Sequence, residues 1–285
     1  MLRRHPIALY LAITFAVTWG VWLSLLAAGR VVTVGFAPLY LVGLFGPLIG
    51  AVVTTAIVGR RRGMRSLVRR LTRVRVGMRW WLIALGVPLG IAVVLYAGGL
   101  LAATFGFGHA KGNFGAFTGF PLTTPLALWA MLVVAGIGEE AGWRGYLLPH
   151  LQRRYSPLVA SIAVAACWAV WHVPAFYLVA TYRAMPLAMI PLFFAGLACG
   201  SVFLTWLYNR GRSSIPLVAV WHGTYNLMTG STGAAGALAA LETTAVMVIA
   251  IVLVARELVA WRRERHGDPA DHVLAPHRAD YLHAR

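Results

Sequence analysis

Residues 125–145 read PLALWAMLVVAGIGEEAGWRG, an apolar run that ends in two adjacent glutamates and an arginine. The run is long enough to cross a bilayer core, which takes about 20 apolar residues in a helix. Glu139 and Glu140 are the only acidic residues before position 242. A carboxylate in hydrocarbon costs several kcal/mol unless it is paired or neutralised. The segment therefore predicts a transmembrane helix that carries a working polar site.

The rest of the chain has the composition of a polytopic membrane protein. Its 285 residues are 60% hydrophobic and 12% charged, with a mean hydropathy of +0.74, outside the range of soluble globular domains. We predict an all-α transmembrane bundle of about eight helices, with apolar windows at 7–29, 36–58, 80–104, 125–145, 158–180, 187–208, 215–230 and 237–258. We expect a transmembrane domain over 1–260 with a basic cytoplasmic loop at 59–79, and a mobile cytoplasmic tail over 261–285.

The net charge of +17 would suit a nucleic-acid-binding protein, but the arginines cluster at helix ends, as the positive-inside rule requires. With both termini cytoplasmic, 22 of the 25 basic residues lie inside, and only Arg30, Lys111 and Arg183 lie outside. We therefore expect a multi-pass protein of the plasma membrane, in contact with the lipid bilayer and without a nucleic-acid partner. The segment from Gly59 to Arg79 predicts either a short basic helix on anionic lipid or plain topogenic charge.

Three pairs of glycines four residues apart predict close approach of helix backbones. The pairs are Gly46 and Gly50, Gly86 and Gly90, and Gly196 and Gly200. We expect a compact bundle.

The two adjacent glutamates differ in their surroundings on a helix. Glu140 and Arg144 are four residues apart and share a face, so they can form an ion pair. Glu139 lies about 100° around the helix and stays free to point elsewhere. One acid is then structural and the other is available for chemistry.

Other polar groups in the apolar windows are His172, and His222 with Asn226 four residues later. Intramembrane ionisable residues are functional by default, which favours one shared site over separate packing roles. A glutamate beside a histidine can take a proton from water, and a second histidine with an amide can stabilise an oxyanion. The same residues, Glu139, His172 and His222, also make a candidate zinc site.

Taking a proton from water and stabilising an oxyanion is the chemistry of peptide-bond hydrolysis. The sequence lacks the motifs of the other kinds of intramembrane protease. The chain has no aspartate before Asp268, which excludes an aspartyl pair in the windows, and no H-E-x-x-H motif. Ser161 and Ser201 lie in apolar windows, but neither is in a recognisable nucleophile motif.

Three ordered motifs resemble the CPBP intramembrane proteases, the CAAX protease and bacteriocin-processing (Abi) family. They are E-E-x-x-x-R from Glu139 to Arg144, an aromatic-x-x-x-His from Trp168 to His172, and His-x-x-x-Asn from His222 to Asn226. The second motif usually begins with Phe, and we expect Trp168 to affect packing more than chemistry.

The resemblance implies an intramembrane endopeptidase that acts on a membrane-associated protein or peptide. By this resemblance, Glu139 activates water, His172 assists, His222 and Asn226 stabilise the oxyanion, and Glu140 with Arg144 orders the site. A divalent metal such as zinc and a metal-free glutamate mechanism both remain open. The alternative function is a non-catalytic transporter or immunity protein that binds protons or cations at the same cluster.

Overall fold

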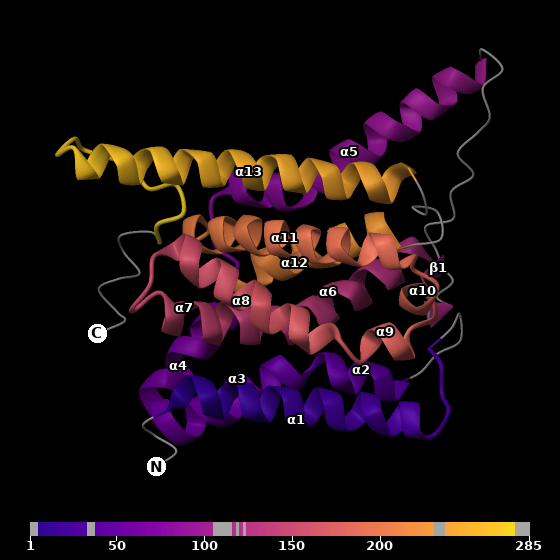
Figure 1. The fold of residues 1–285 in the computed structure, drawn as a ribbon, viewed down its shortest axis with the longest axis horizontal. Helices are drawn as coiled ribbons and strands as arrows, with labels where there is room; N and C mark the ends of the chain where they lie inside the picture. The colour runs from indigo at the N-terminus through magenta and orange to yellow at the C-terminus, as the bar shows by residue number, and fades with distance from the viewer. Residues whose placement is uncertain are drawn as a thin grey trace.

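The structure, a computed structural model, describes residues 5–32, 38–104, 116–117, 120–121, 124–230 and 237–276. Most of its helices lie side by side along one common direction (Figure 1). The strands within these ranges are β1 (Ala116–Phe117) and β2 (Phe120–Pro121), which form one short antiparallel pair. The predicted all-α polytopic bundle is confirmed.

Every predicted window contains helix. The N-terminal part comprises α1 (Pro6–Ala27), α2 (Pro38–Leu44), α3 (Gly46–Thr54), the π-helix η2 (Thr55–Gly59), α4 (Arg60–Leu71) and α5 (Met78–Thr104). The middle comprises α6 (Pro125–Gly142), the π-helix η3 (Trp143–Leu147), α7 (Leu148–Leu151), α8 (Pro157–His172), α9 (Ala175–Leu178) and α10 (Ala180–Arg183). The last part comprises the 3-10 helix η4 (Leu187–Met189), α11 (Ile190–Arg210), α12 (Ile215–Gly230) and α13 (Ala237–Arg265).

The helices differ in length more than the sequence windows do. Within the described part of the chain, five are long and apolar enough to cross a membrane: Pro6–Ala27, Pro125–Leu151, Pro157–Leu178, Leu187–Arg210 and Leu238–Arg265. The second window is interrupted at Phe45, where α2 ends and α3 begins. The chain is thus a multi-pass membrane protein with unequal helices.

Proline and hydroxyl side chains set the starts of the two helices that lead into the polar cluster. Pro125 and Pro157 occupy the first helical positions of α6 and α8, where the missing backbone N–H costs nothing. Thr124 Oγ1 accepts a hydrogen bond from Ala127 N, and Ser156 Oγ accepts one from Val159 N. These side chains satisfy backbone donors that a helix start leaves unpaired.

Glycines bring α6 and α12 close together. A Cβ on Gly136 would lie 3.0 Å from the carbonyl oxygen of Ala219, and one on Gly223 would lie 2.6 Å from Val133 N. No larger residue fits between these two backbones without displacing them. This contact places the end of α6 beside the middle of α12.

The predicted glycine pairs do not behave alike. A Cβ on Gly46 would collide with Thr18, and one on Gly50 with Thr14, so this pair packs directly on α1. Gly196 lies against Thr243 of α13, whereas a Cβ on Gly86, Gly90 or Gly200 would meet nothing within 4 Å. Glycine spacing predicted one close helix contact in full and a second only at Gly196.

Residues 261–276 of the predicted C-terminal tail lie within the described part of the chain. Helix α13 continues through Trp261 to Arg265, and the chain then returns to the bundle, where Val273 and Leu274 are buried. Asn209 Nδ2 on α11 donates a hydrogen bond to Leu274 O at 2.7 Å. These contacts of Leu274 do not follow from the charge and proline content of the tail, on which the prediction of mobility rests.

Candidate active site

The polar cluster is built where three helices meet. Helix α6 contributes Glu139 and Glu140 near its end, α8 contributes Trp168 and His172, and α12 contributes His222. Both glutamates and His222 are buried. Helix α6 passes into η3 at Trp143, and such π-helical turns are frequent at functional sites.

Glu140 binds two partners through one oxygen. Arg144 Nη1 lies 3.0 Å from Glu140 Oε1, so the predicted ion pair is present and both side chains are fully buried. His222 Nδ1 lies 2.8 Å from the same oxygen. The sequence did not predict this second contact, which ties α12 to α6 and fixes the orientation of the His222 ring.

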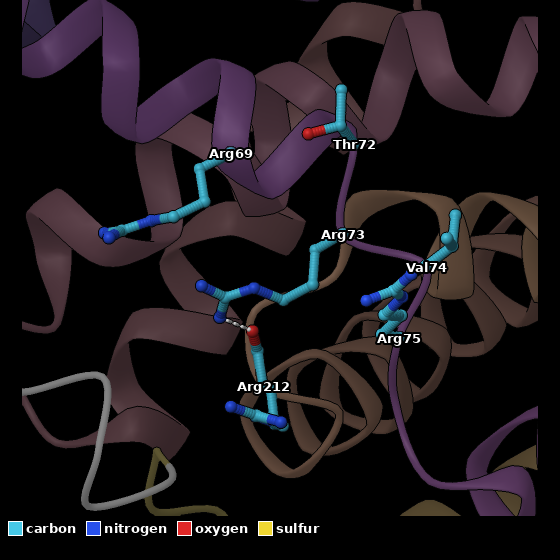
Figure 2. A pocket seen from close by; sticks show the side chains of 6 residues that line it. All are labelled: Arg69, Thr72, Arg73, Val74, Arg75 and Arg212. Carbon is cyan, nitrogen blue, oxygen red and sulfur yellow. Dashed lines mark hydrogen bonds between the residues drawn. The ribbon is translucent and has the colours of Figure 1, made fainter.

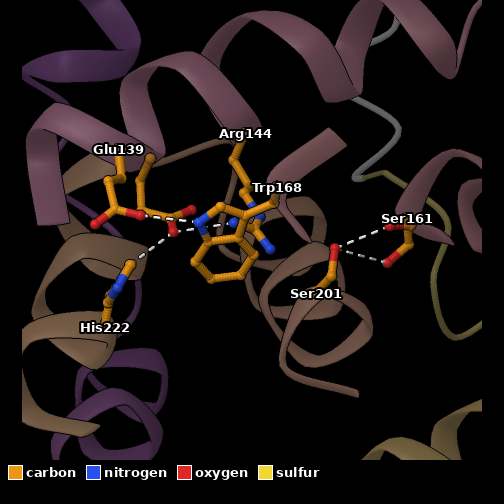
Figure 3. Close-up of polar contacts among 7 residues, drawn as sticks. Glu139, Arg144, Ser161, Trp168, Ser201 and His222 are labelled. Atoms are coloured by element: carbon orange, nitrogen blue, oxygen red, sulfur yellow. Dashed lines mark hydrogen bonds and ion pairs between the residues drawn. The ribbon is translucent and has the colours of Figure 1, made fainter. Parts of the chain in front are cut away.

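Glu139 is held by a different residue. Trp168 Nε1 on α8 donates a hydrogen bond to Glu139 Oε2 at 2.9 Å, and the guanidinium of Arg144 lies 4.8 Å from the centre of the Trp168 ring (Figure 3). We expected Trp168 to affect packing more than chemistry. Its indole N–H instead contacts the carboxylate to which water activation is assigned, a contact that a phenylalanine could not make.

The His172 ring is oriented by its own helix. His172 Nδ1 lies 2.8 Å from the carbonyl oxygen of Trp168. A carbonyl can only accept, so Nδ1 carries the proton and Nε2 is the acceptor of the neutral ring. The ring centre of Trp168 lies 5.7 Å from that of His172 and 5.6 Å from that of His222. Because both distances are measured from the same Trp168 ring, the ring centres of His172 and His222 are no farther apart than the sum of the two.

The structure thus brings together Glu139, Glu140, Arg144 and His222. His172 is next to this group, because its ring packs against Trp168, which bonds Glu139. Asn226 is partly buried one turn after His222 on α12. Among the described residues, neither His172 nor Asn226 forms a hydrogen bond with the Glu139 or Glu140 carboxylate. These two side chains remain available to other partners.

The residues do not assemble into a clear metal site. Within the described ranges, no group of three or more His, Cys, Asp or Glu side chains has an arrangement that could hold a metal ion. The contacts of Glu139 Oε2 with Trp168 and of His222 Nδ1 with Glu140 orient these two side chains, and they leave Glu139 Oε1 and His222 Nε2 for other partners. The hydrogen bonds therefore describe an oriented acid and base pair.

The two serines in the apolar windows pair with each other. Ser201 Oγ donates to Ser161 O at 2.9 Å, and Ser161 Oγ lies 3.4 Å from Ser201 Oγ (Figure 3). In the part of the chain that the structure describes, neither hydroxyl bonds a histidine. The pair joins α8 to α11 and has none of the contacts of an activated nucleophile.

Sequence reasoning overlooked a third buried carboxyl group. Glu242 on α13 is fully buried, and neither of its oxygens has a hydrogen-bond partner among the described residues. Its signal was available, since it is an acidic residue inside the window 237–258. It is not part of the hydrogen-bonded cluster around Glu139 and Glu140.

Comparison with known proteins matches the part of the chain that contains the cluster. Residues 120–228 match the family described as type II CAAX prenyl endopeptidase, Rce1-like, and this range contains every residue of the cluster. The chain is also 26% identical over 226 residues to CAAX prenyl protease 2 of Methanococcus maripaludis, which covers 77% of this chain and 82% of the relative. Both findings support the resemblance to the CPBP proteases that the three motifs suggested.

Proposed function

Because both comparisons support membership of the CPBP (CAAX protease) family, we propose that this multi-pass membrane protein is an intramembrane endopeptidase that hydrolyses a peptide bond with Glu139 as general base. The observation that supports this role most directly is the hydrogen bond from Trp168 Nε1 to Glu139 Oε2. It orients the carboxylate and leaves Oε1 to take a proton. A positioned base of this kind accelerates hydrolysis by about 10² to 10⁴.

The proton transfers follow from the partners of each side chain. Glu139 Oε1 takes a proton from water as the water oxygen attacks the carbonyl carbon of the substrate. His172 assists through Nε2, which is the acceptor of the neutral ring because Nδ1 donates to Trp168 O. When the tetrahedral intermediate collapses, Glu139 returns the proton to the leaving amine.

His222 and Asn226 stabilise the negative charge that develops on the carbonyl oxygen. With Nδ1 donating to Glu140 Oε1, a protonated His222 donates from Nε2 as well. The Glu140 carboxylate favours this protonated form by its charge, and Arg144 balances the charge of Glu140. Asn226 Nδ2 provides a second donor to the oxyanion.

A divalent metal is not needed for these steps. We propose the metal-free form of the mechanism because the described residues do not present a three-ligand group. Activity that survives treatment with a chelator such as 1,10-phenanthroline would support this form. Loss of activity that is restored by zinc alone would contradict it.

The substrate class we propose is a membrane-associated protein or peptide. We place the enzyme itself in the plasma membrane with both of its termini in the cytoplasm. The family description and the name of the relative point to processing of a CAAX-type prenylated C-terminus. Bacteriocin or self-immunity processing is the other class within the CPBP resemblance. A panel of prenylated CAAX peptides, their unprenylated forms and bacteriocin precursors distinguishes the two classes.

Glu139→Gln tests the proposed role of the base. Glutamine keeps the size of the side chain and an oxygen that accepts from Trp168, but it cannot take a proton from water. We expect purified Glu139→Gln to lose cleavage of the peptide panel by about 10² to 10⁴ and to melt near the wild-type temperature.

Glu242→Gln is the matched control, because it removes a buried carboxyl group from α13 away from the cluster. It should keep wild-type cleavage. Full activity in the Glu139→Gln protein would refute the assignment of the base.

A further inference from the structure

A basic pocket lies outside the candidate active site. Its cavity has a volume of about 400 Å³ and is lined by the end of α4, the segment that leads to α5, and the turn between α11 and α12. Figure 2 shows the lining residues, which are Arg69, Thr72, Arg73, Val74, Arg75 and Arg212. They include four guanidinium groups and one hydroxyl and no carboxylate, so the pocket is suited to an anion.

The pocket is fixed to the elements around it. Arg73 Nη1 donates to Arg212 O across the pocket (Figure 2). Ser214 Oγ donates to Arg73 O at 2.5 Å and also accepts from Leu217 N in the first turn of α12. The arginines are therefore presented by a connected wall of the fold and not by a free loop.

Tryptophans beside the pocket favour a position for it at the depth of lipid headgroups. Trp81 Nε1 donates to the carbonyl oxygen of the lining residue Val74, and Trp80 packs edge-on against Trp206 of α11. Tryptophan is enriched at the membrane–water interface. Among nearby apolar side chains, Val74 is 56% exposed and Met78 is 71% exposed, which suits insertion between lipids.

We propose that this pocket binds a phosphate group. Arginine forks match phosphate oxygens with two parallel N–H donors. The phosphate can come from the headgroup of an anionic phospholipid or from a soluble phosphate compound, and the chemistry of recognition is the same.

The test measures the melting temperature of the purified full-length protein in detergent against three titrants. They are short-chain phosphatidylglycerol, phosphatidylcholine of the same chain length, and inorganic phosphate. The variant Arg69→Gln with Arg75→Gln removes two pocket charges and keeps the contact between Arg73 and Arg212. The control Arg61→Gln with Arg62→Gln removes the same charge from exposed positions of α4 that do not line the pocket.

Phosphatidylglycerol should raise the wild-type melting temperature where phosphatidylcholine does not. The pocket variant should need a roughly 25-fold higher concentration, since each basic residue near an anionic group contributes a factor of about five, and the control should match wild type. A pocket-dependent response to inorganic phosphate as well would identify a general phosphate site. Equal responses of the pocket variant and the control, or no response to either phosphate titrant, would overturn the proposal.

Discussion

Trp168 offers a direct residue-level test, because one hydrogen bond connects it to Glu139. Trp168→Phe keeps an aromatic ring over Arg144 but removes the indole donor. A hydrogen bond to a charged group contributes about 1.5 to 3 kcal/mol, so we expect kcat to fall roughly 10- to 100-fold. The KM for a peptide should change little, since Trp168 is proposed to position the base and not the substrate.

Trp171→Phe is the matched control on the same helix. Trp171 Nε1 donates to Thr18 Oγ1 at 2.8 Å, away from both glutamates. This variant should lower the melting temperature and leave kcat near wild type. If both tryptophan variants lose kcat equally, the effect comes from packing of α8 and not from the Glu139 contact.

The two neighbouring glutamates should differ in their effects on stability. Glu140→Gln leaves Arg144 without its carboxylate in a fully buried position, and breaking a buried ion pair costs about 3–5 kcal/mol. We expect Glu140→Gln and Arg144→Ala to lower both melting temperature and activity. Thermal unfolding of the purified variants beside Glu139→Gln measures this, and identical unfolding of the Glu139 and Glu140 variants would contradict the division of roles.

At this scale, local contacts could be predicted and distant ones could not. The pair of Glu140 and Arg144 follows from helix periodicity, because both residues lie within one turn and a half. The contacts of Trp168 with Glu139 and of His222 with Glu140 join separate helices, and periodicity does not say which faces of two helices meet. The family motifs named these residues but not their hydrogen-bond partners.

At the scale of helices, glycine spacing gives a paired test. Gly46→Ala should destabilise the protein, because the new methyl group would collide with Thr18 and lie 2.9 Å from the carbonyl oxygen of Thr14. Gly86→Ala has the same chemistry in open space. It should be neutral or stabilise by up to about 1 kcal/mol through helix propensity. Melting temperatures of the two variants, purified in the same detergent, check this, and equal losses would show that packing against α1 is not the cause.

The return of the chain after α13 predicts a dependence on pH. His272 Nδ1 lies 2.8 Å from Glu257 Oε1, and His272 Nε2 lies 2.8 Å from Glu264 Oε1. Burial disfavours the charged ring, but the hydrogen bonds to both carboxylates outweigh it and raise the pKa of His272. A raised pKa stabilises the docked segment below the ordinary histidine value, and this stabilisation is lost as pH rises through the pKa of the folded state.

Hydrogen exchange at Leu274 measures this docking, because its amide donates to Glu257 Oε2. After correction for the intrinsic rate, protection should fall with rising pH in the wild type. His272→Gln should remove the dependence, and His266→Gln, at an exposed position nearby, should keep it. A dependence that persists in His272→Gln would rule out His272 as its source.

The irregular elements were beyond sequence periodicity for a physical reason. An apolar run of about 20 residues predicts a helix. The hydrophobic pattern does not reveal the break at Phe45 between α2 and α3 or the π-helical turn after Gly142. The proline starts of α6 and α8, in contrast, were readable from residues in the first turn.

At the scale of the whole molecule, the distribution of arginine predicts an orientation. Helices α4 and α7 lie at one end of the bundle and α9 and α10 lie at the other (Figure 1). The first end collects the arginines of α4 and of the turn after α11, whereas Arg183 lies at the second. The positive-inside rule places the arginine-rich end in the cytoplasm. Reporter fusions after residues 70 and 285 should therefore both report the cytoplasm, and a fusion after Arg183 should report the outer side. An external signal at residue 70 or 285, or a cytoplasmic one at Arg183, would contradict this orientation.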